Sequence, residues 1–165
     1  MLAEPESSVA YHHRISDTIG NFTALFENYQ QFGTSVCGAS DINGDLVADL
    51  IVGSPYAGST GMVEVLFLTR DGQVSSHQRI NNTVGQLTAT LSYSYFGSGV
   101  TEVGYLNTDD VPDLAVGGWG IGDGGFNRGG VFVLFLTTAG TILSHQKISD
   151  TAGNLGRSTI ILACA

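Results

Sequence analysis

The hydrophobic positions of the chain fall into short runs that are separated by polar, glycine-rich segments. In the first half, such runs predict strands near 34 to 40 and at 49 to 54, 62 to 69 and 74 to 80. The segment VLFL in the third run is apolar on both faces, which is typical of a strand covered from both sides. Asp71-Gly72 before the fourth run favours a hairpin. This half therefore predicts four consecutive antiparallel strands.

The same pattern returns in the second half of the chain. FGTSV at 32 to 36 recurs as FGSGV at 96 to 100, DLIVG at 49 to 53 as DLAVG at 113 to 117, and VEVLFLT at 63 to 69 as VFVLFLT at 131 to 137, with a spacing of 64 to 68 residues. Four-stranded repeats that pack only on their neighbours are typical of the blades of a β-propeller. The chain is therefore predicted to be all-β, with two complete four-stranded antiparallel blades.

The segments outside the two repeats match the pattern only in part. Residues 9 to 16 correspond to the last strand of a unit and predict one strand of a preceding blade. The predicted organisation is this strand with a linker at 1-31, the first blade with its linker at 32-95, the second blade at 96-155, and a tail at 156-165 that departs from the repeat. Because a propeller closes with roughly four to eight blades, we interpret the sequence as a fragment of a larger propeller.

Composition and charge exclude several classes of function. The net charge is -9, with only six Lys and Arg residues in 165, which argues against binding to nucleic acid or to an anionic membrane surface. No apolar run approaches the about 18 residues of a membrane span, so direct membrane insertion is not expected. The N-terminal segment shows no secretory signal. We therefore expect either a cytoplasmic chain or a piece of a longer exported protein.

The ordered motifs resemble the FG-GAP repeats of integrin α-subunit propellers, in the long version found in microbial relatives. The FG element is Phe32-Gly33 and Phe96-Gly97, and the GAP element is Gly53-Ser54-Pro55 and the poorer Gly117-Gly118-Trp119. Between them the family carries a calcium loop, which here is DINGDLVAD at 41 to 49. The resemblance covers nearly the whole chain up to Leu155. It implies an extracellular, calcium-binding propeller that functions in adhesion or ligand recognition.

The residues of this loop predict a Ca²⁺ site on their own chemistry. Asp41, Asn43, Asp45 and Asp49 stand at loop positions one, three, five and nine, and alternate residues of a tight turn can point inward together. Calcium takes six to eight oxygen ligands, so the backbone carbonyl of Val47 and water would complete the shell. Without a cation, carboxylates some 4 Å apart repel by about 1 to 4 kcal/mol per pair. The alternative is a plain Asx-rich turn, because Asp, Asn and Gly dominate turns.

The corresponding segment of the second repeat, YLNTDDVPD, predicts a weaker site. Asn107, Asp109 and Asp113 match as side-chain ligands, with Val111 at the carbonyl position. Tyr105 replaces the first Asp. Metal binding and its absence therefore both stay open here, with lower affinity expected if the metal binds.

Three further sets of residues are candidates for function. Trp119 and Phe126 lie in the Gly-rich segment GWGIGDGGFNRGG at 118 to 130 and are the candidate ligand-contact residues, because long surface loops often carry binding specificity. NFT at Asn21 and NNT at Asn81 are N-glycosylation sequons in the inter-blade linkers. A histidine recurs at 12, 77 and 145, on different blades, so a repeated packing role is expected rather than metal binding.

Two functions remain in competition. The favoured hypothesis is a non-catalytic, calcium-binding module for adhesion or ligand recognition at the cell surface, with further propeller repeats and a protein or glycan ligand as partners. The alternative is an accessory propeller domain of an exported hydrolase whose active site lies outside this chain. A degenerate fragment without a function of its own is a third hypothesis. In the first two cases the chain is expected to be extracellular, and glycosylated if the sequons are used.

Overall fold

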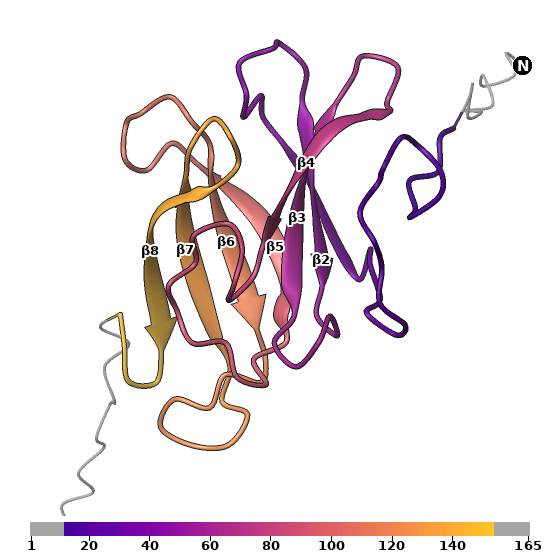
Figure 1. The fold of residues 1–165 in the computed structure, drawn as a ribbon. Coiled ribbons are helices and arrows are strands. Elements are labelled where there is room, and N and C mark those ends of the chain that lie inside the picture. Colours follow the sequence, from indigo (N-terminus) through magenta and orange to yellow (C-terminus); the bar gives the residue numbers. More distant parts are fainter. Residues whose placement is uncertain (1–11, 154–165) are drawn as a thin grey trace, which may run out of the picture.

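The computed structural model describes residues 12–153, and within this range the chain forms eight strands and no helix. The strands are β1 (Ser35–Ala39), β2 (Asp49–Ser54), β3 (Met62–Leu68), β4 (Val74–Ile80), β5 (Phe96–Gly104), β6 (Asp113–Gly118), β7 (Gly130–Leu136) and β8 (Ile142–Ser149). Figure 1 shows them as two sheets that lie against each other. The predicted positions of all four strands of the first repeat are therefore confirmed within about one residue at each end.

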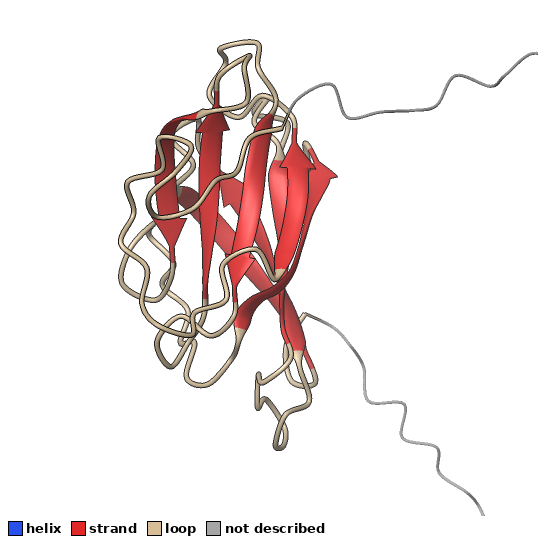
Figure 2. Ribbon diagram, turned by 90° about the vertical axis from the view of Figure 1, so that its right-hand side faces the viewer, coloured by secondary structure: helices blue, strands red, loops and turns tan. Residues whose placement is uncertain are grey.

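Each sheet is a four-stranded antiparallel meander in chain order, β1-β2-β3-β4 and β5-β6-β7-β8. We call the first sheet blade 1 and the second blade 2. Since consecutive strands alternate in direction, the β1–β2 and β5–β6 connections lie at one end of the blades and the long β6–β7 loop lies at the other (Figure 1). Figure 2 shows the strands of the two blades crossing at an angle, as expected from the twist of each sheet.

The main hydrophobic core lies between the two blades. Val63, Val65 and Phe67 project from one face of β3 and are almost fully buried, in the same cluster as Leu114 and Phe132 of blade 2. Burying a side chain of this size contributes about 1.5 to 3 kcal/mol. The apolar pattern of β3 thus supplies the contact that stacks one blade on the next.

The opposite face of blade 1 is covered by the chain that precedes it. Leu66 and Val52 on this face pack with Phe22 and Ala24 of the N-terminal linker in a second cluster. The segment VLFL is therefore buried on both sides, as its sequence predicts.

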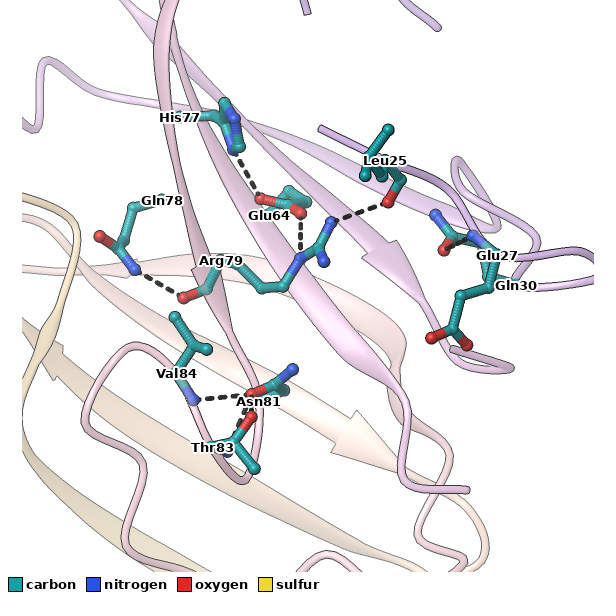
Figure 3. A network of polar contacts seen from close by, with 10 residues as sticks. All are labelled: Leu25, Glu27, Gln30, Glu64, His77, Gln78, Arg79, Asn81, Thr83 and Val84. Atoms are coloured by element: carbon teal, nitrogen blue, oxygen red, sulfur yellow. Dashed lines mark hydrogen bonds and ion pairs between the residues drawn. The ribbon is translucent and has the colours of Figure 1, made fainter. Parts of the chain in front are cut away.

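Blade 1 also buries a charged group that blade 2 lacks. Glu64 in β3 is fully buried and accepts a hydrogen bond from Arg79 Nε at 2.6 Å, and it lies 3.2 Å from His77 Nδ1 (Figure 3). Phe132 occupies the equivalent register position of blade 2 and packs against the ring of His145. Both recurring histidines in the described blades thus contact a residue of their own sheet, which supports a packing role.

The expected strand of a preceding blade does not form over residues 12–16. In this segment only Ser16 takes part in a bridge, to Ile19, and residues 9–11 lie outside the described range. The equivalent strand β4 pairs with β3 along its whole length.

Candidate metal-binding loops

Loop 1, residues 41–49, connects β1 to β2 at the end of blade 1. Its first residue organises the turn: Asp41 Oδ1 accepts the N–H groups of Gly44 at 2.7 Å and Asp45 at 3.0 Å, and Oδ2 accepts the N–H of Leu46 at 2.7 Å. Gly44 and Leu46 have positive φ values of 81° and 64°, which coil the backbone around this carboxylate. Glycine adopts such values without strain, whereas Leu46 does so at a cost.

The middle of loop 1 is held by two further predicted ligands. Asn43 Oδ1 accepts the N–H of Asp45 at 3.0 Å, and Asn43 Nδ2 donates to Asp45 Oδ2 at 3.1 Å. Asp45 Oδ1 accepts the N–H of Val47 at 2.8 Å. Asn43, Asp45 and Val47 are thus linked by hydrogen bonds between residues two positions apart.

Asp49 closes loop 1 from inside the protein. Its side chain is only 2% exposed, and its two oxygens accept the N–H groups of Ile42 at 3.0 Å and Leu68 at 3.1 Å. Burial raises the pKa of Asp49 above its ordinary value, the two hydrogen bonds lower it, and the nearby charges of Asp45 and Asp41 raise it. The charges of Asp41 and Asp45 therefore act on the buried carboxylate of Asp49.

Loop 2, residues 105–113, repeats this arrangement at the end of blade 2. Asn107 Nδ2 donates to Asp109 Oδ2 at 2.7 Å, and Asp109 Oδ1 accepts the N–H of Val111 at 3.0 Å. Asp113 is fully buried and accepts the N–H groups of Leu106 at 2.9 Å and Leu136 at 3.2 Å. All four of these contacts have a counterpart in loop 1.

Two features of loop 2 differ from loop 1. Tyr105 stands in place of Asp41 and is 51% exposed, so the carboxylate that accepts three N–H groups in loop 1 has no counterpart at this position. Asn107 Oδ1 is buried and has no hydrogen-bond partner among the described residues. An oxygen in this state fits a ligand for a cation, because an unpartnered buried polar atom costs free energy.

The donor set of the two loops fits a hard cation better than any other group. Every predicted ligand is a carboxylate, amide or carbonyl oxygen, which calcium and magnesium prefer. Within residues 12–153, no group of three or more His, Cys, Asp or Glu side chains is gathered closely enough to hold a metal. In loop 1 the carboxylates instead bind backbone N–H groups. The fit therefore rests on the chemistry of the oxygens, on the electrostatics of Asp49 and on the orphaned oxygen of Asn107.

The predicted contact residues Trp119 and Phe126 lie at the opposite end of the blades, in the β6–β7 loop. Trp119 is 44% exposed and stacks on Tyr95 with ring centroids 3.8 Å apart, and Tyr95 also meets the edge of Tyr56. Phe126 is 93% exposed. The structure thus places Trp119 in a row of three aromatic rings that spans both blades, whereas Phe126 stands outside that row.

The loop that carries these residues is fixed to β8 and the segment after it by charge. Lys147 Nζ lies 2.7 Å from Asp123, and Arg128 Nη1 lies 2.6 Å from Asp150. Hydrogen bonds from Lys147 and Ser149 lower the pKa of Asp123. The Gly-rich segment is therefore anchored at two points.

The two predicted glycosylation sites differ in exposure, since Asn21 is exposed and Asn81 is half-buried. The Nδ2 of Asn21 donates to Gln73 Oε1 at 2.9 Å. Asn81 Oδ1 accepts the N–H groups of Thr83 and Val84, both at 2.8 Å, and lies 3.0 Å from the hydroxyl of Thr83 (Figure 3). The amide nitrogen of Asn81 is not used in these contacts.

The structure also contains a recess that the sequence analysis missed. It has a volume of about 500 Å³ and lies between the N-terminal linker and the β2–β3 loop, beside Arg79. Gln30 in its lining is 4% exposed, and its Nε2 has no hydrogen-bond partner among the described residues. Since the linker and the loop are far apart in sequence, no local motif signals this recess.

Comparison with known proteins agrees with the repeats. The family model described as FG-GAP repeat matches residues 32–76. The chain is 32% identical over 139 residues to integrin alpha pat-2 of Caenorhabditis briggsae, and 30% identical over 138 residues to phosphatidylinositol-glycan-specific phospholipase D of Bos taurus. Each match covers 79% of this chain but only 11% and 15% of the respective relative. Integrin alpha-2 of Bos taurus is 30% identical over 92 residues, which is 54% of this chain and 8% of the relative.

These similarities and the fold together define the class. The two stacked four-stranded sheets are β-propeller blades. The chain is an FG-GAP repeat protein, as its motifs indicate. The repeat is a non-catalytic propeller module, although one relative carries the name of a phospholipase. No helix among the described residues is long and apolar enough to cross a membrane.

Proposed function

We propose that the chain is a non-catalytic, calcium-binding propeller module for adhesion or ligand recognition outside the cell. The observation that carries this proposal is loop 1. There Asp41, Asn43 and Asp45 organise one turn, and the buried Asp49 has a raised pKa because of desolvation and the two neighbouring carboxylates. A cation beside these carboxylates would favour the ionised form of Asp49.

Loop 1 would hold the ion through its oxygens. Asp41, Asn43, Asp45 and Asp49 would supply side-chain ligands and Val47 a backbone carbonyl. Bound Ca²⁺ would neutralise the mutual repulsion of the carboxylates and tie the β1–β2 connection together. The hydrogen bonds of Asp49 to Ile42 and Leu68 hold one ligand rigidly in the protein, which lowers the entropy cost of closing the loop on an ion.

Loop 2 is the weaker of the two proposed sites. Asn107, Asp109 and Asp113 would be its side-chain ligands and Val111 its carbonyl ligand, and the orphaned oxygen of Asn107 supports this assignment. Loop 2 has lost its leading carboxylate to Tyr105. Fewer charges mean lower calcium affinity.

For ligand recognition, we assign the contact surface to the end of the blades opposite the calcium loops. Trp119 is half-exposed at the end of an aromatic row, and Phe126 is almost fully exposed in the same loop. Large exposed aromatic side chains are typical of binding surfaces. A protein or glycan at the cell surface is the proposed ligand, and further propeller repeats are the proposed neighbours. Sugars on Asn21 and Asn81 would lie on exposed linkers.

The second candidate function is an accessory domain of an exported hydrolase. The similarity to phosphatidylinositol-glycan-specific phospholipase D supports it, because this relative joins such repeats to a chain named as an enzyme. Sequencing the flanking coding region separates the two candidates. Further repeats in register favour the adhesion module, whereas an adjacent catalytic domain favours the hydrolase.

The calcium proposal is tested by thermal unfolding of the chain with calcium and with a chelator. At a calcium concentration of about 100 times the Kd, the free energy of unfolding should rise by about 2.7 kcal/mol, which corresponds to a Tm increase of about 5 to 10 °C for a chain of this size. Magnesium at the same concentration is the control and should raise Tm much less, because it rarely uses an all-protein cage. An unchanged Tm with calcium would contradict the proposal.

A further inference from the structure

Blade 2 holds the start of loop 1 through one carboxylate. Glu102 in β5 accepts a hydrogen bond from the backbone N–H of Ser40 at 2.5 Å through Oε2 and from the Ser40 hydroxyl at 2.9 Å through Oε1. The backbone N–H of Glu102 in turn donates to Cys37 Sγ at 3.3 Å. Both Glu102 and Ser40 are half-buried. A two-point, charge-assisted contact of this kind fixes both the distance and the orientation of the residue it binds.

The contact lies beside the first proposed ligand of loop 1. Ser40 directly precedes Asp41, whose carboxylate binds three backbone N–H groups of the turn. On its other side, Ser40 follows Ala39, which pairs in register with Asp49 at the far end of the loop. Fixing Ser40 therefore fixes the first proposed ligand relative to the last.

The equivalent positions of the other blade cannot make this contact. Aligned on the repeats, Gly38 of blade 1 corresponds to Glu102, and Gly104 of blade 2 corresponds to Ser40. A third blade packed on blade 2 would thus find no hydroxyl at the start of loop 2. The contact is particular to loop 1 and is not a general feature of the repeat.

We propose that Glu102 is a positioning residue that presets loop 1 for a cation, so that the calcium affinity of loop 1 depends on the docking of blade 2. This inference rests on the proposed calcium function. A loop already held in its binding conformation loses less entropy on binding, which raises affinity without a new ligand. By linkage, calcium in loop 1 also strengthens the packing of the two blades.

A first experiment needs no metal. In calcium-free buffer, hydrogen exchange of the Leu46 amide reports the order of the turn, because this N–H is bound by Asp41. The variant Glu102→Ala should speed this exchange by about tenfold. Ser35→Ala is the matched control, since it removes the hydrogen bond from Ser35 Oγ to Gly97 O in the same interface, at the other end of β1. It should leave Leu46 exchange unchanged, and equal acceleration in both variants would overturn the inference.

A second experiment measures calcium binding by calorimetry on the full chain. Glu102→Ala should weaken the tighter site by about tenfold, and Ser40→Ala by about threefold, because the latter removes one contact and leaves the charge of Glu102 in place. Ser35→Ala should keep the wild-type affinity. Should Glu102→Ala fold poorly, Glu102→Gln replaces it, as its single carbonyl oxygen can keep one of the two contacts.

The outcomes separate this inference from the calcium proposal. Wild-type calcium binding that persists unchanged in both Glu102→Ala and Glu102→Gln overturns the positioning role alone. A loss in Glu102→Ala without any loss in Ser40→Ala assigns the effect to charge through space and also overturns it. Absence of binding in the wild type overturns the calcium proposal, while the exchange experiment still decides whether Glu102 orders the loop.

Discussion

Loop 1 and loop 2 have the same backbone course but different chemistry. Gly44 and Leu46 in loop 1 have φ values of 81° and 64°, and their counterparts Thr108 and Asp110 in loop 2 both have φ values of 61°. At neither of these two positions do the loops have the same side chain. The left-handed positions are therefore kept even where a β-branched residue must adopt them at a cost.

The difference between the loops shows which residues determine the conformation. Asp41 binds three backbone N–H groups in loop 1, and loop 2 has Tyr105 instead, yet the turn persists. The loops share the buried carboxylate at the end, Asp49 or Asp113, with the same two backbone contacts, and also the Asn–Asp and Asp–N–H contacts in the middle of the turn. These shared contacts are thus sufficient to hold the turn, and the first carboxylate is available to set its affinity.

The largest effect is expected from removing the shared carboxylate. Asp49→Ala leaves the N–H groups of Ile42 and Leu68 without their acceptor, and Asp113→Ala does the same to Leu106 and Leu136. Each unsatisfied donor costs about 1 to 3 kcal/mol, so each variant, which leaves two donors unsatisfied, should lose about 2 to 6 kcal/mol in the free energy of unfolding. Urea unfolding in chelator measures this loss. A loss below about 1 kcal/mol in either variant would show that the carboxylate does not hold the loop.

A smaller effect is expected from exchanging the residues that differ at the first position. Tyr105→Asp restores the leading carboxylate of loop 2 and should tighten calcium binding there by about tenfold, or about 1.4 kcal/mol. The reverse change, Asp41→Tyr, should weaken loop 1 by at least as much. Calorimetry of both variants measures the two sites. If the Tyr105→Asp isotherm matches the wild type, the difference between the loops does not lie at this position.

A third pair of variants exchanges the residues at the left-handed position. Open space surrounds the site of a Cβ on Gly44, so Gly44→Thr should destabilise only through its backbone, by about 1 kcal/mol. Thr108→Gly should stabilise by somewhat less, because glycine also gains entropy in the unfolded chain. Thermal unfolding in chelator gives both values. The two changes in the free energy of unfolding should have opposite signs, and equal signs would contradict the shared backbone conformation.

The smallest effect concerns pH. The pKa of Asp49 is raised in the folded chain, so between its ordinary value and the raised value the folded chain binds more protons than the unfolded chain. In the absence of calcium, the contribution of Asp49 to the free energy of unfolding therefore falls as pH rises through this window. Calcium needs the ionised carboxylate, so the Tm difference with and without calcium should shrink as pH falls from about 7 towards about 4. A difference independent of pH would exclude Asp49 as a ligand.

The sequence was sufficient for the strands, because they follow local rules, whereas the assignment of the loop residues as metal ligands stays a prediction. Alternation, the Asp-Gly turn and the two-faced apolar run of β3 determine the blades, and the repeat confirms them. The contact of Glu102 with Ser40 joins residues 62 positions apart, so it gives no local signal. The aromatic row of Tyr56, Tyr95 and Trp119 was missed for the same reason.

Calorimetric titration of calcium into the wild-type chain and Asp45→Ala tests the central claim most directly. Asp45 is exposed, and its carboxylate binds only the N–H of Val47 and the amide of Asn43. Its removal should therefore spare the fold and abolish the tighter calcium site, while the weaker site of loop 2 keeps its affinity. If the tighter isotherm is the same in Asp45→Ala as in the wild type, loop 1 is an Asx-rich turn and not a calcium site.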